Sequence, residues 1–327
     1  MLERELTGLR GASVAEKGAG WVLEKDGPGG ERRERVDLAF VHGSLRDVVE
    51  VRGESVNGLA QKVAEFFLGS LRGERIETAW PSVWDGPGEM VGLGRRVASV
   101  EAAFGELLKK KLARVGKLAT PERPRAVGLA RGLWVWFVDF GRAFVAREAW
   151  LNGPRRMADD PLAPSRSFLK VEEAYLVLGC EPATGETVCD LGAAPGGWSY
   201  SAAKRGARVV AVDNGPLKGG ALNHPGIEHR REDAFKFSAE DGQAFDWLFC
   251  DMVEDPRHVL RNIVEPWLSR GWCRRFVVNL KFGRVDPLGL LGELEGNAVL
   301  RERVEGLAVR HLYHDREEFT VVGTVRR

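Results

Sequence analysis

The chain has 327 residues, of which 44% are hydrophobic and 29% charged, and its 48 basic and 47 acidic side chains leave a formal net charge of +1. This composition excludes an intrinsically disordered chain, and about 150 residues per domain predicts two domains. We find no run of about 18 apolar residues that could span a membrane, no signal-peptide core, and no CxxC pair among the four cysteines. We therefore expect a cytoplasmic protein.

The first 150 residues alternate between short strand-like and helix-like segments. Residues 26–40, DGPGGERRERVDLAF, predict a charged, glycine-rich loop that leads into a strand. Residues 55–71 place Leu59 and Val63 at helical spacing and predict a helix. Residues 132–148 are rich in β-branched and aromatic side chains and predict strands.

A turn-rich connector, NGPRRMADDPLAPSRS, occupies residues 152–167. Proline, glycine and charged residues concentrate there, so we place the domain boundary inside it. The predicted organisation is a smaller α+β region over residues 1–155 and a second domain over residues 156–327.

The second domain shows the alternation of a doubly wound α/β sheet. Nearly continuous apolar runs predict strands buried on both faces at residues 187–191, 208–213, 246–252 and 275–281. Helical segments, most clearly residues 257–271, separate these runs, which favours a mainly parallel, Rossmann-like sheet. Residues 307–327 predict two strands joined by a charged turn, as an antiparallel edge of the sheet.

A glycine-rich bend, DLGAAPGGW, follows the first of these strands, where doubly wound sheets bind their ligands. A dinucleotide site requires G-x-G-x-x-G, but Ala193, Ala194 and Pro195 follow Gly192 and break that spacing. Acids beside the bend and after it fit S-adenosyl-L-methionine better, because that ligand is a cation with ribose hydroxyls and no phosphate. These acids are Asp190, Asp213 and Asp233.

The residues after the strands indicate which atom would receive a methyl group. The Asn/Asp-Pro-Pro-aromatic run of amino-group methyltransferases is missing from CDMVED, and Cys250 lacks the proline setting of a nucleophile for pyrimidine carbons. Cys250 is therefore expected in the core. Two lysines and two acids near predicted strand ends and in the helix after the connector remain: Lys170, Asp251, Lys281 and Glu318.

These residues and their surroundings resemble a known enzyme family. Lysine, aspartate, lysine and glutamate in this order around DLGAAPGGW are similar to the FtsJ-type RNA ribose 2′-O-methyltransferases, within them the bacterial 23S rRNA (cytidine-2′-O)-methyltransferases with an N-terminal THUMP domain. The matching blocks span most of residues 163–327: APSRSFLKVEEAY, DLGAAPGGW, VDNGPL, REDAFKF, CDMVE, GWCRRFVVNLK and LYHDREEFTV.

The resemblance implies a role for each of these positions. It implies that Lys281 accepts the proton of the ribose hydroxyl, supported by Lys170, Asp251 and Glu318. It implies cofactor contacts from Ser167, Ala194, Pro195, Gly196, Gly197, Asp213, Asp233 and Asp251. Strand alternation sends only one of Glu317 and Glu318 inward, and the family block favours Glu318.

The chemistry expected of Lys281 depends on its pKa. Free lysine titrates near ~10.4, so a neutral amine at physiological pH needs help. A second ammonium, that of Lys170, and partial burial would both lower the pKa of Lys281. General-base assistance is worth roughly 10²–10⁴-fold, and no metal is needed because a sulfonium is already activated.

The charge of the chain is unevenly distributed. Residues 95–150 hold 12 Lys/Arg and 5 Asp/Glu, a net +7, most densely in LLKKKLARVGK. Such a face attracts RNA phosphates, and the family resemblance implies a THUMP-like role in positioning 23S rRNA or its precursor. Within this stretch Trp134 and Trp136 alternate on a predicted strand, so at least one is expected in the core.

Two alternative functions remain open at this stage. The first is a non-catalytic RNA-binding protein on a methyltransferase scaffold, against which the presence of all four polar positions argues. The second is a nicotinamide-dependent oxidoreductase, against which the broken G-x-G spacing argues.

Overall fold

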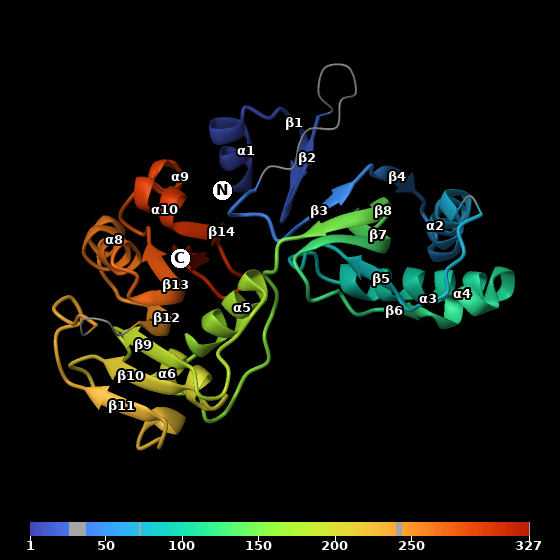
Figure 1. Ribbon diagram of the computed structural model, residues 1–327. Coiled ribbons are helices and arrows are strands. Elements are labelled where there is room, and N and C mark those ends of the chain that lie inside the picture. The colour runs from blue at the N-terminus through green and yellow to red at the C-terminus, as the bar shows by residue number, and fades with distance from the viewer. Residues whose placement is uncertain (26–36, 72, 240–243, 327) are drawn as a thin grey trace. The chain divides into compact units, whose positions relative to one another are not determined.

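The computed structural model describes residues 1–25, 37–71, 73–239 and 244–326, and it divides into two compact units (Figure 1). Unit 1 comprises Met1–Ser13, Asp26–His42 and Gly153–Arg327. Unit 2 comprises Val14–Lys25 and Gly43–Asn152. Among the described residues no helix is both long enough and apolar enough to cross a bilayer.

Unit 1 is built on a seven-stranded sheet in the order β11-β10-β9-β12-β13-β15-β14. Its strands are β9 (Thr187–Leu191), β10 (Arg208–Val212), β11 (Ile227–Arg230), β12 (Phe245–Cys250), β13 (Cys273–Lys281), β14 (Val304–Arg310) and β15 (Glu318–Val325). The first five pair in parallel, whereas β15 pairs antiparallel with both β13 and β14. The predicted Rossmann-like sheet with an antiparallel edge is confirmed.

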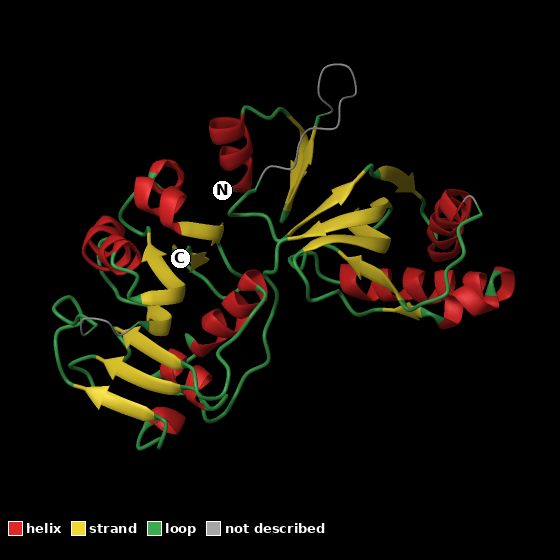
Figure 2. Cartoon of the chain, viewed as in Figure 1, coloured by secondary structure: helices red, strands yellow, loops and turns green. Residues whose placement is uncertain are grey.

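Helices cover both faces of this sheet (Figure 2). They are α1 (Leu2–Arg10), α5 (Phe168–Leu178), α6 (Gly197–Ala203), α7 (Pro256–Val259), α8 (Glu265–Ser269), α9 (Pro287–Gly296) and α10 (Ala298–Arg303), with the short 3₁₀-helix η1 (Gly219–Ala221) and the π-helix η2 (Leu260–Val264). Alternate residues of each strand enter opposite cores: Val277 packs with α5 and α6, whereas Val278 packs with the side of α8 and α9. Burial on both faces explains why the strands are nearly continuous apolar runs.

Unit 2 packs helices against one sheet. Its strands are β3 (Gly43–Arg46), β4 (Val49–Arg52), β5 (Trp80–Asp85), β6 (Ala119–Thr120), β7 (Gly128–Asp139) and β8 (Arg142–Leu151), with the hairpin β1 (Val14–Gly18) and β2 (Trp21–Glu24). Its helices are α2 (Val56–Leu71), α3 (Leu93–Lys111) and α4 (Ala113–Lys117). The predicted helix at residues 55–71 and the predicted strands at 132–148 are confirmed, and Trp134 is buried as expected for a core position.

The first helix belongs to unit 1, whereas a single boundary near residue 155 would separate it from that unit. The buried carboxylate of Glu5 accepts hydrogen bonds from the backbone N–H groups of Ala39, at 2.7 Å, and Phe40, at 3.0 Å. Arg10 forms an ion pair with Glu295 of α9. These long-range contacts place α1 and residues 37–42 with the α/β sheet. Most of the loop expected at residues 26–40 lies outside the described residues.

Candidate active site

The glycine-rich bend lies at the carboxyl end of β9, where the strand order of the sheet reverses. Gly192 has φ +76° and a Cβ atom there would lie 2.3 Å from Cγ of Met252. Gly196 has φ +105° and a Cβ atom there would lie 2.5 Å from Cβ of Ala221. Both positions therefore require glycine, for backbone conformation and for space.

Asp213, directly after β10, fixes the shape of this bend. One carboxylate oxygen accepts the backbone N–H of Ala194 at 3.0 Å, and the other accepts the N–H of Gly215 at 2.7 Å. A carboxylate has about four lone-pair positions, so Asp213 can still accept hydrogen bonds from a ligand. The residue therefore links the bend to the end of the neighbouring strand.

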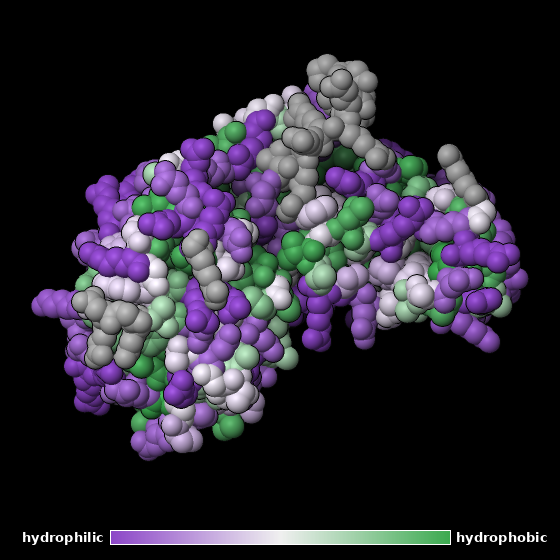
Figure 3. Space-filling model, in the orientation of Figure 1, coloured by the Kyte–Doolittle hydropathy of each residue, from purple (hydrophilic) through white to green (hydrophobic). Residues whose placement is uncertain are grey.

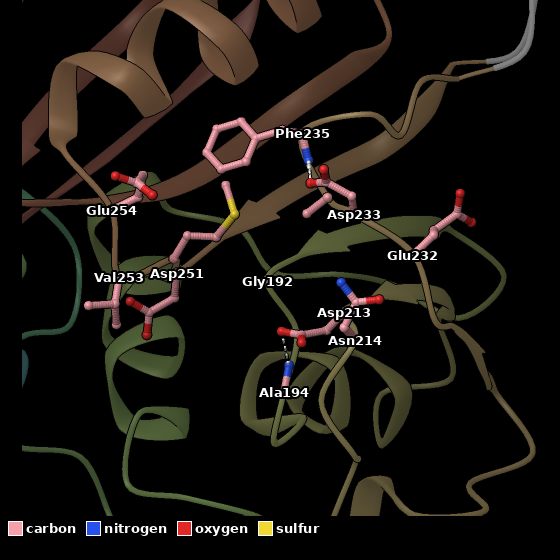
Figure 4. Close-up of a pocket in the computed structure, with 12 residues that line it drawn as sticks. Gly192, Ala194, Asp213, Asn214, Glu232, Asp233, Phe235, Asp251, Val253 and Glu254 are labelled. Atoms are coloured by element: carbon pink, nitrogen blue, oxygen red, sulfur yellow. Dashed lines mark hydrogen bonds between the residues drawn. The ribbon is translucent and has the colours of Figure 1, made fainter.

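A cavity of about 560 Å³ opens beside the bend (Figure 4). It is lined by Gly192, Ala194, Asp213, Asn214, Glu232, Asp233, Ala234, Phe235, Asp251, Met252, Val253 and Glu254. Five of these side chains are carboxylates and none is a lysine or arginine. Carboxylates accept hydrogen bonds from ribose hydroxyls and attract a cation but repel a pyrophosphate, so the cavity fits S-adenosyl-L-methionine and not a dinucleotide.

The two lysines and two acids singled out in the sequence lie together at the carboxyl ends of β12 and β13. Lys281 ends β13 and forms ion pairs with Asp251 and with Glu318, the latter at 2.7 Å. Lys170, on the first turn of α5, lies 2.5 Å from the other oxygen of Glu318 and 3.6 Å from Asp251. Charges of opposite sign thus alternate around the group, and all four side chains are mostly buried.

The acids reverse the pKa shift that was expected for Lys281. Burial disfavours its ammonium form, but the nearby carboxylates of Asp251 and Glu318 outweigh burial and raise the pKa of Lys281 above its usual value. The prediction that crowding with Lys170 lowers the pKa of Lys281 is therefore wrong. For Glu318, burial raises the pKa, but the two lysines outweigh burial and hold it below its usual range.

The predicted cofactor residues fall into two groups. Ala194, Asp213, Asp233 and Asp251 line the cavity. Pro195, Gly196 and Gly197 form the bend without lining the cavity, and Ser167 lies at the start of α5, where its carbonyl accepts the indole N–H of Trp198 at 2.9 Å. Sequence reasoning missed several lining residues, namely Asn214, Glu232, Ala234, Phe235, Met252, Val253 and Glu254. Each lies within three residues of a predicted position, which is the signal that could have found them.

Two further predicted positions belong to the interior. Cys250 is fully buried, and burial raises the pKa of its thiol to about 12, which agrees with its expected place in the core. Asp190 is buried too and accepts a hydrogen bond of 2.6 Å from the hydroxyl of Ser199. Burial raises the pKa of Asp190 to about 7, and Asp190 does not line the cavity, unlike the other two acids that were expected to suit the cofactor.

Comparison with known proteins decides the family. Ribosomal RNA large subunit methyltransferase M of Laribacter hongkongensis (strain HLHK9) is 34% identical over 323 residues, which is 94% of this chain and 86% of that protein. The chain belongs to the ribosomal RNA large subunit methyltransferase M family. The relative of the same name from Stenotrophomonas maltophilia (strain K279a) is 37% identical over 72% of this chain and 68% of that protein.

A family model agrees with this assignment. The model of the FtsJ-like methyltransferases matches residues 163–277, which include the bend and Asp251. Among solved structures, a TehB-like SAM-dependent methyltransferase of Corynebacterium glutamicum matches with 17% identity and a TM-score of 0.33. The match covers 52% of this chain and 90% of the chain of that methyltransferase. As a member of the ribosomal RNA large subunit methyltransferase M family, the chain is an RNA methyltransferase. Its cofactor is S-adenosyl-L-methionine, as the sequence predicted.

Proposed function

We propose that this enzyme methylates the ribose 2′-hydroxyl of a cytidine in 23S rRNA, with Lys281 as the proton acceptor. The observation that carries the proposal is the position of Asp251, which both lines the cofactor cavity and binds Lys281. A hydroxyl placed between the cavity and Lys281 would be in reach of the methyl donor and of a base.

Each residue of the group would have a distinct task. Lys281 takes the proton of the hydroxyl, Glu318 and Asp251 hold the amine in place, and Lys170 balances the second carboxylate charge. When bound, S-adenosyl-L-methionine supplies a methyl group already activated on a sulfonium. The protein contributes orientation of the hydroxyl, which is the larger effect, and general-base assistance of roughly 10²–10⁴-fold.

The shared carboxylate also explains how Lys281 becomes a base. Asp251 and Glu318 raise the pKa of Lys281, so its amine is protonated at neutral pH. A cation in the cavity would interact with the same carboxylate of Asp251, which weakens the hold of that carboxylate on the ammonium. Occupation of the cavity should therefore lower the pKa of Lys281 toward the working pH.

Unit 2 would position the RNA, in the role expected of a THUMP-like domain. Several basic residues counted in the sequence belong to the fold instead: Arg131 pairs with Glu74 and Arg142 with Glu16. The end of α3 and α4 is different, because its lysines and its arginine are exposed. Hydrophilic side chains gather at this end of unit 2, beside hydrophobic ones (Figure 3). We name this basic surface by its residues: Lys110, Lys111, Arg114 and Lys117. Exposed cations of this kind bind phosphates irrespective of base sequence.

Mapping the product tests the proposal directly. The full chain is incubated with S-adenosyl-L-methionine and 23S rRNA from cells that lack the enzyme, and the RNA is then digested to nucleosides and analysed by mass spectrometry. We expect 2′-O-methylcytidine, and the phosphodiester beside it should resist alkali because the hydroxyl that attacks it is blocked. Methyl groups found only on bases would refute the ribose assignment.

Two lysine variants test the proposed base. Lys281→Met should lose methyl transfer by roughly 10²–10⁴-fold, the size of general-base catalysis. Cofactor affinity, measured by calorimetry, should stay near that of the wild type. Lys218→Met, which changes an exposed lysine of the same unit, is the matched control and should retain full activity. An active Lys281→Met enzyme would remove Lys281 from its role.

A further inference from the structure

Behind Asp251, a row of buried polar side chains extends across two strands to the loop before Glu318. The amide nitrogen of Asn279 on β13 lies 3.2 Å from a carboxylate oxygen of Asp251. The hydroxyl of Thr320 on β15 lies 2.7 Å from the amide oxygen of Asn279. The carboxyl group of Asp315 lies 3.0 Å from the same hydroxyl. Relative exposures of 0%, 1% and 8% for Asn279, Thr320 and Asp315 exclude these groups from bulk water.

The hydrogen atoms of this row can be assigned by counting donors. Asp251 is held by two lysines and is an acceptor only, so Asn279 must turn its NH₂ toward Asp251 and its oxygen toward Thr320. The single hydroxyl proton of Thr320 is then required for the oxygen of Asn279. Nothing remains for Thr320 to donate to Asp315.

The contact between Thr320 and Asp315 consequently needs a proton on Asp315. An ionised Asp315 would either face a lone pair of Thr320 or take its proton and leave the oxygen of Asn279 without a donor. Both arrangements are costly in a buried site. The backbone N–H of Leu312 also donates to Asp315, at 2.8 Å, and fixes the orientation of its carboxyl group.

The charged groups that face Asp315 agree with this assignment. Burial is the main effect, and with the carboxylate of Glu318 it outweighs the N–H of Leu312 and the ammonium of Lys170. Together they raise the pKa of Asp315 to about 8. A neutral acid also spares the active site a third buried carboxylate beside Asp251 and Glu318.

We propose that Asp315 is a protonated positioning residue which, through Thr320 and Asn279, orients the carboxylate of Asp251 toward Lys281. The row donates in one direction, from Asp315 to Thr320 to Asn279 to Asp251. The effect of this row on catalysis rests on the proposed function of Lys281. The protonation of Asp315 does not depend on that function and can be measured without RNA.

Carbon-13 NMR of the full chain labelled at aspartate carboxyl groups measures the protonation. The spectrum of the wild type should contain a carboxyl signal that titrates above pH 7 and is missing from Asp315→Asn. If the missing signal titrates below about 5, as an ordinary aspartate does, the proposal is overturned. This result is independent of whether the enzyme methylates ribose.

Matched variants measure the positioning effect. Asp315→Asn keeps an N–H donor for Thr320 and should retain most of the wild-type kcat, as should Thr320→Ser, which keeps the hydroxyl. Asp315→Leu and Thr320→Val break the row and should lower kcat about tenfold, the cost of one buried hydrogen bond. The KM for S-adenosyl-L-methionine should change little, since neither residue lines the cavity.

The proposal is judged by comparing kcat within two pairs of variants, one pair at Asp315 and one at Thr320. Equal loss of kcat in Asp315→Asn and Asp315→Leu would show that an ionised carboxylate is needed, which contradicts the proposal. An unchanged kcat in Thr320→Val would remove the row from catalysis. Cofactor binding by calorimetry confirms that each variant is folded. Should Asp315→Leu fail to fold, the Thr320 pair still tests whether the row acts in catalysis, and the NMR titration tests the protonation of Asp315.

Discussion

Lys281 and Glu318 lie directly opposite each other on the antiparallel strands β13 and β15, with 2.7 Å between the ammonium nitrogen and a carboxylate oxygen. The pairing register therefore builds half of the charged group. A shift of one residue would place Glu317 or Phe319 opposite Lys281 and send Glu318 to the other face of the sheet. Asp251, which follows β12 on the other side of β13, completes the contacts of Lys281.

Replacing Glu318 by glutamine should move the pH dependence of methyl transfer. The carboxylate of Glu318 raises the pKa of Lys281, so its loss lowers that pKa and leaves more neutral amine at a given pH. The wild-type rate should rise with pH until Lys281 has titrated. In Glu318→Gln we expect this rise at lower pH, together with a lower maximum because the amine is held less firmly.

The neighbouring acid is the control for this measurement. Glu317→Gln changes an exposed side chain and should leave the pH profile of the methylation rate where it is in the wild type. If the rise of the rate in Glu318→Gln stays in place or moves to higher pH, Lys281 is not the group that titrates.

Removing the basic surface of unit 2 should weaken RNA binding without affecting the cofactor site. Changing Lys110, Lys111, Arg114 and Lys117 together to glutamine removes four exposed cations. The KM for rRNA should rise, and the salt dependence of binding should become less steep, by up to about 0.9 for each phosphate that is no longer neutralised. Glutamine at Arg131, which is paired with Glu74, is the control. An unchanged salt dependence in the quadruple variant would place the RNA elsewhere.

Two aspartates that line the cavity should differ in their effect on cofactor affinity. Asp213→Ala removes the acceptor for the N–H groups of Ala194 and Gly215 and loosens the bend. Asp233→Ala removes the acceptor for only one, the N–H of Phe235 at 3.0 Å. We expect calorimetry to show a loss of affinity in both and a larger loss, about tenfold or more, in Asp213→Ala. The reverse order would show that Asp213 is not what shapes the bend.

The first helix should contribute to the stability of unit 1. Glu5→Ala leaves the N–H groups of Ala39 and Phe40 without their acceptor, which should cost about 1–3 kcal/mol of unfolding free energy. Arg4→Ala, on the same helix as Glu5, removes an exposed ion pair with Asp286 and should lower the stability less than Glu5→Ala does. Denaturant unfolding followed by tryptophan fluorescence compares the two. Equal effects would mean that α1 is only loosely attached.

Much of unit 1 could be predicted from local patterns. Continuous apolar runs at residues 187–191 and 275–281 predicted strands correctly, because a strand buried on both faces has little choice of side chains. The bend after Leu191 was predicted from its glycines, and the backbone angle and contacts of Gly192 show why no other residue fits. The boundary predicted near residue 155 separates residues 1–13 from the unit to which they belong, since a contact such as Arg10 with Glu295 leaves no local signal.

The sequence by itself determined the alternation of strands and helices, the place of the bend and the polar residues available at the strand ends, because these follow from local periodicity and residue type. Only the tertiary structure decided that Glu318 faces Lys281 and that the pKa of Lys281 is raised. It also placed Asp315, Thr320 and Asn279 in one row behind Asp251. Strand register and burial set the distances between charges that are far apart in the chain, and the sign of a pKa shift depends on those distances.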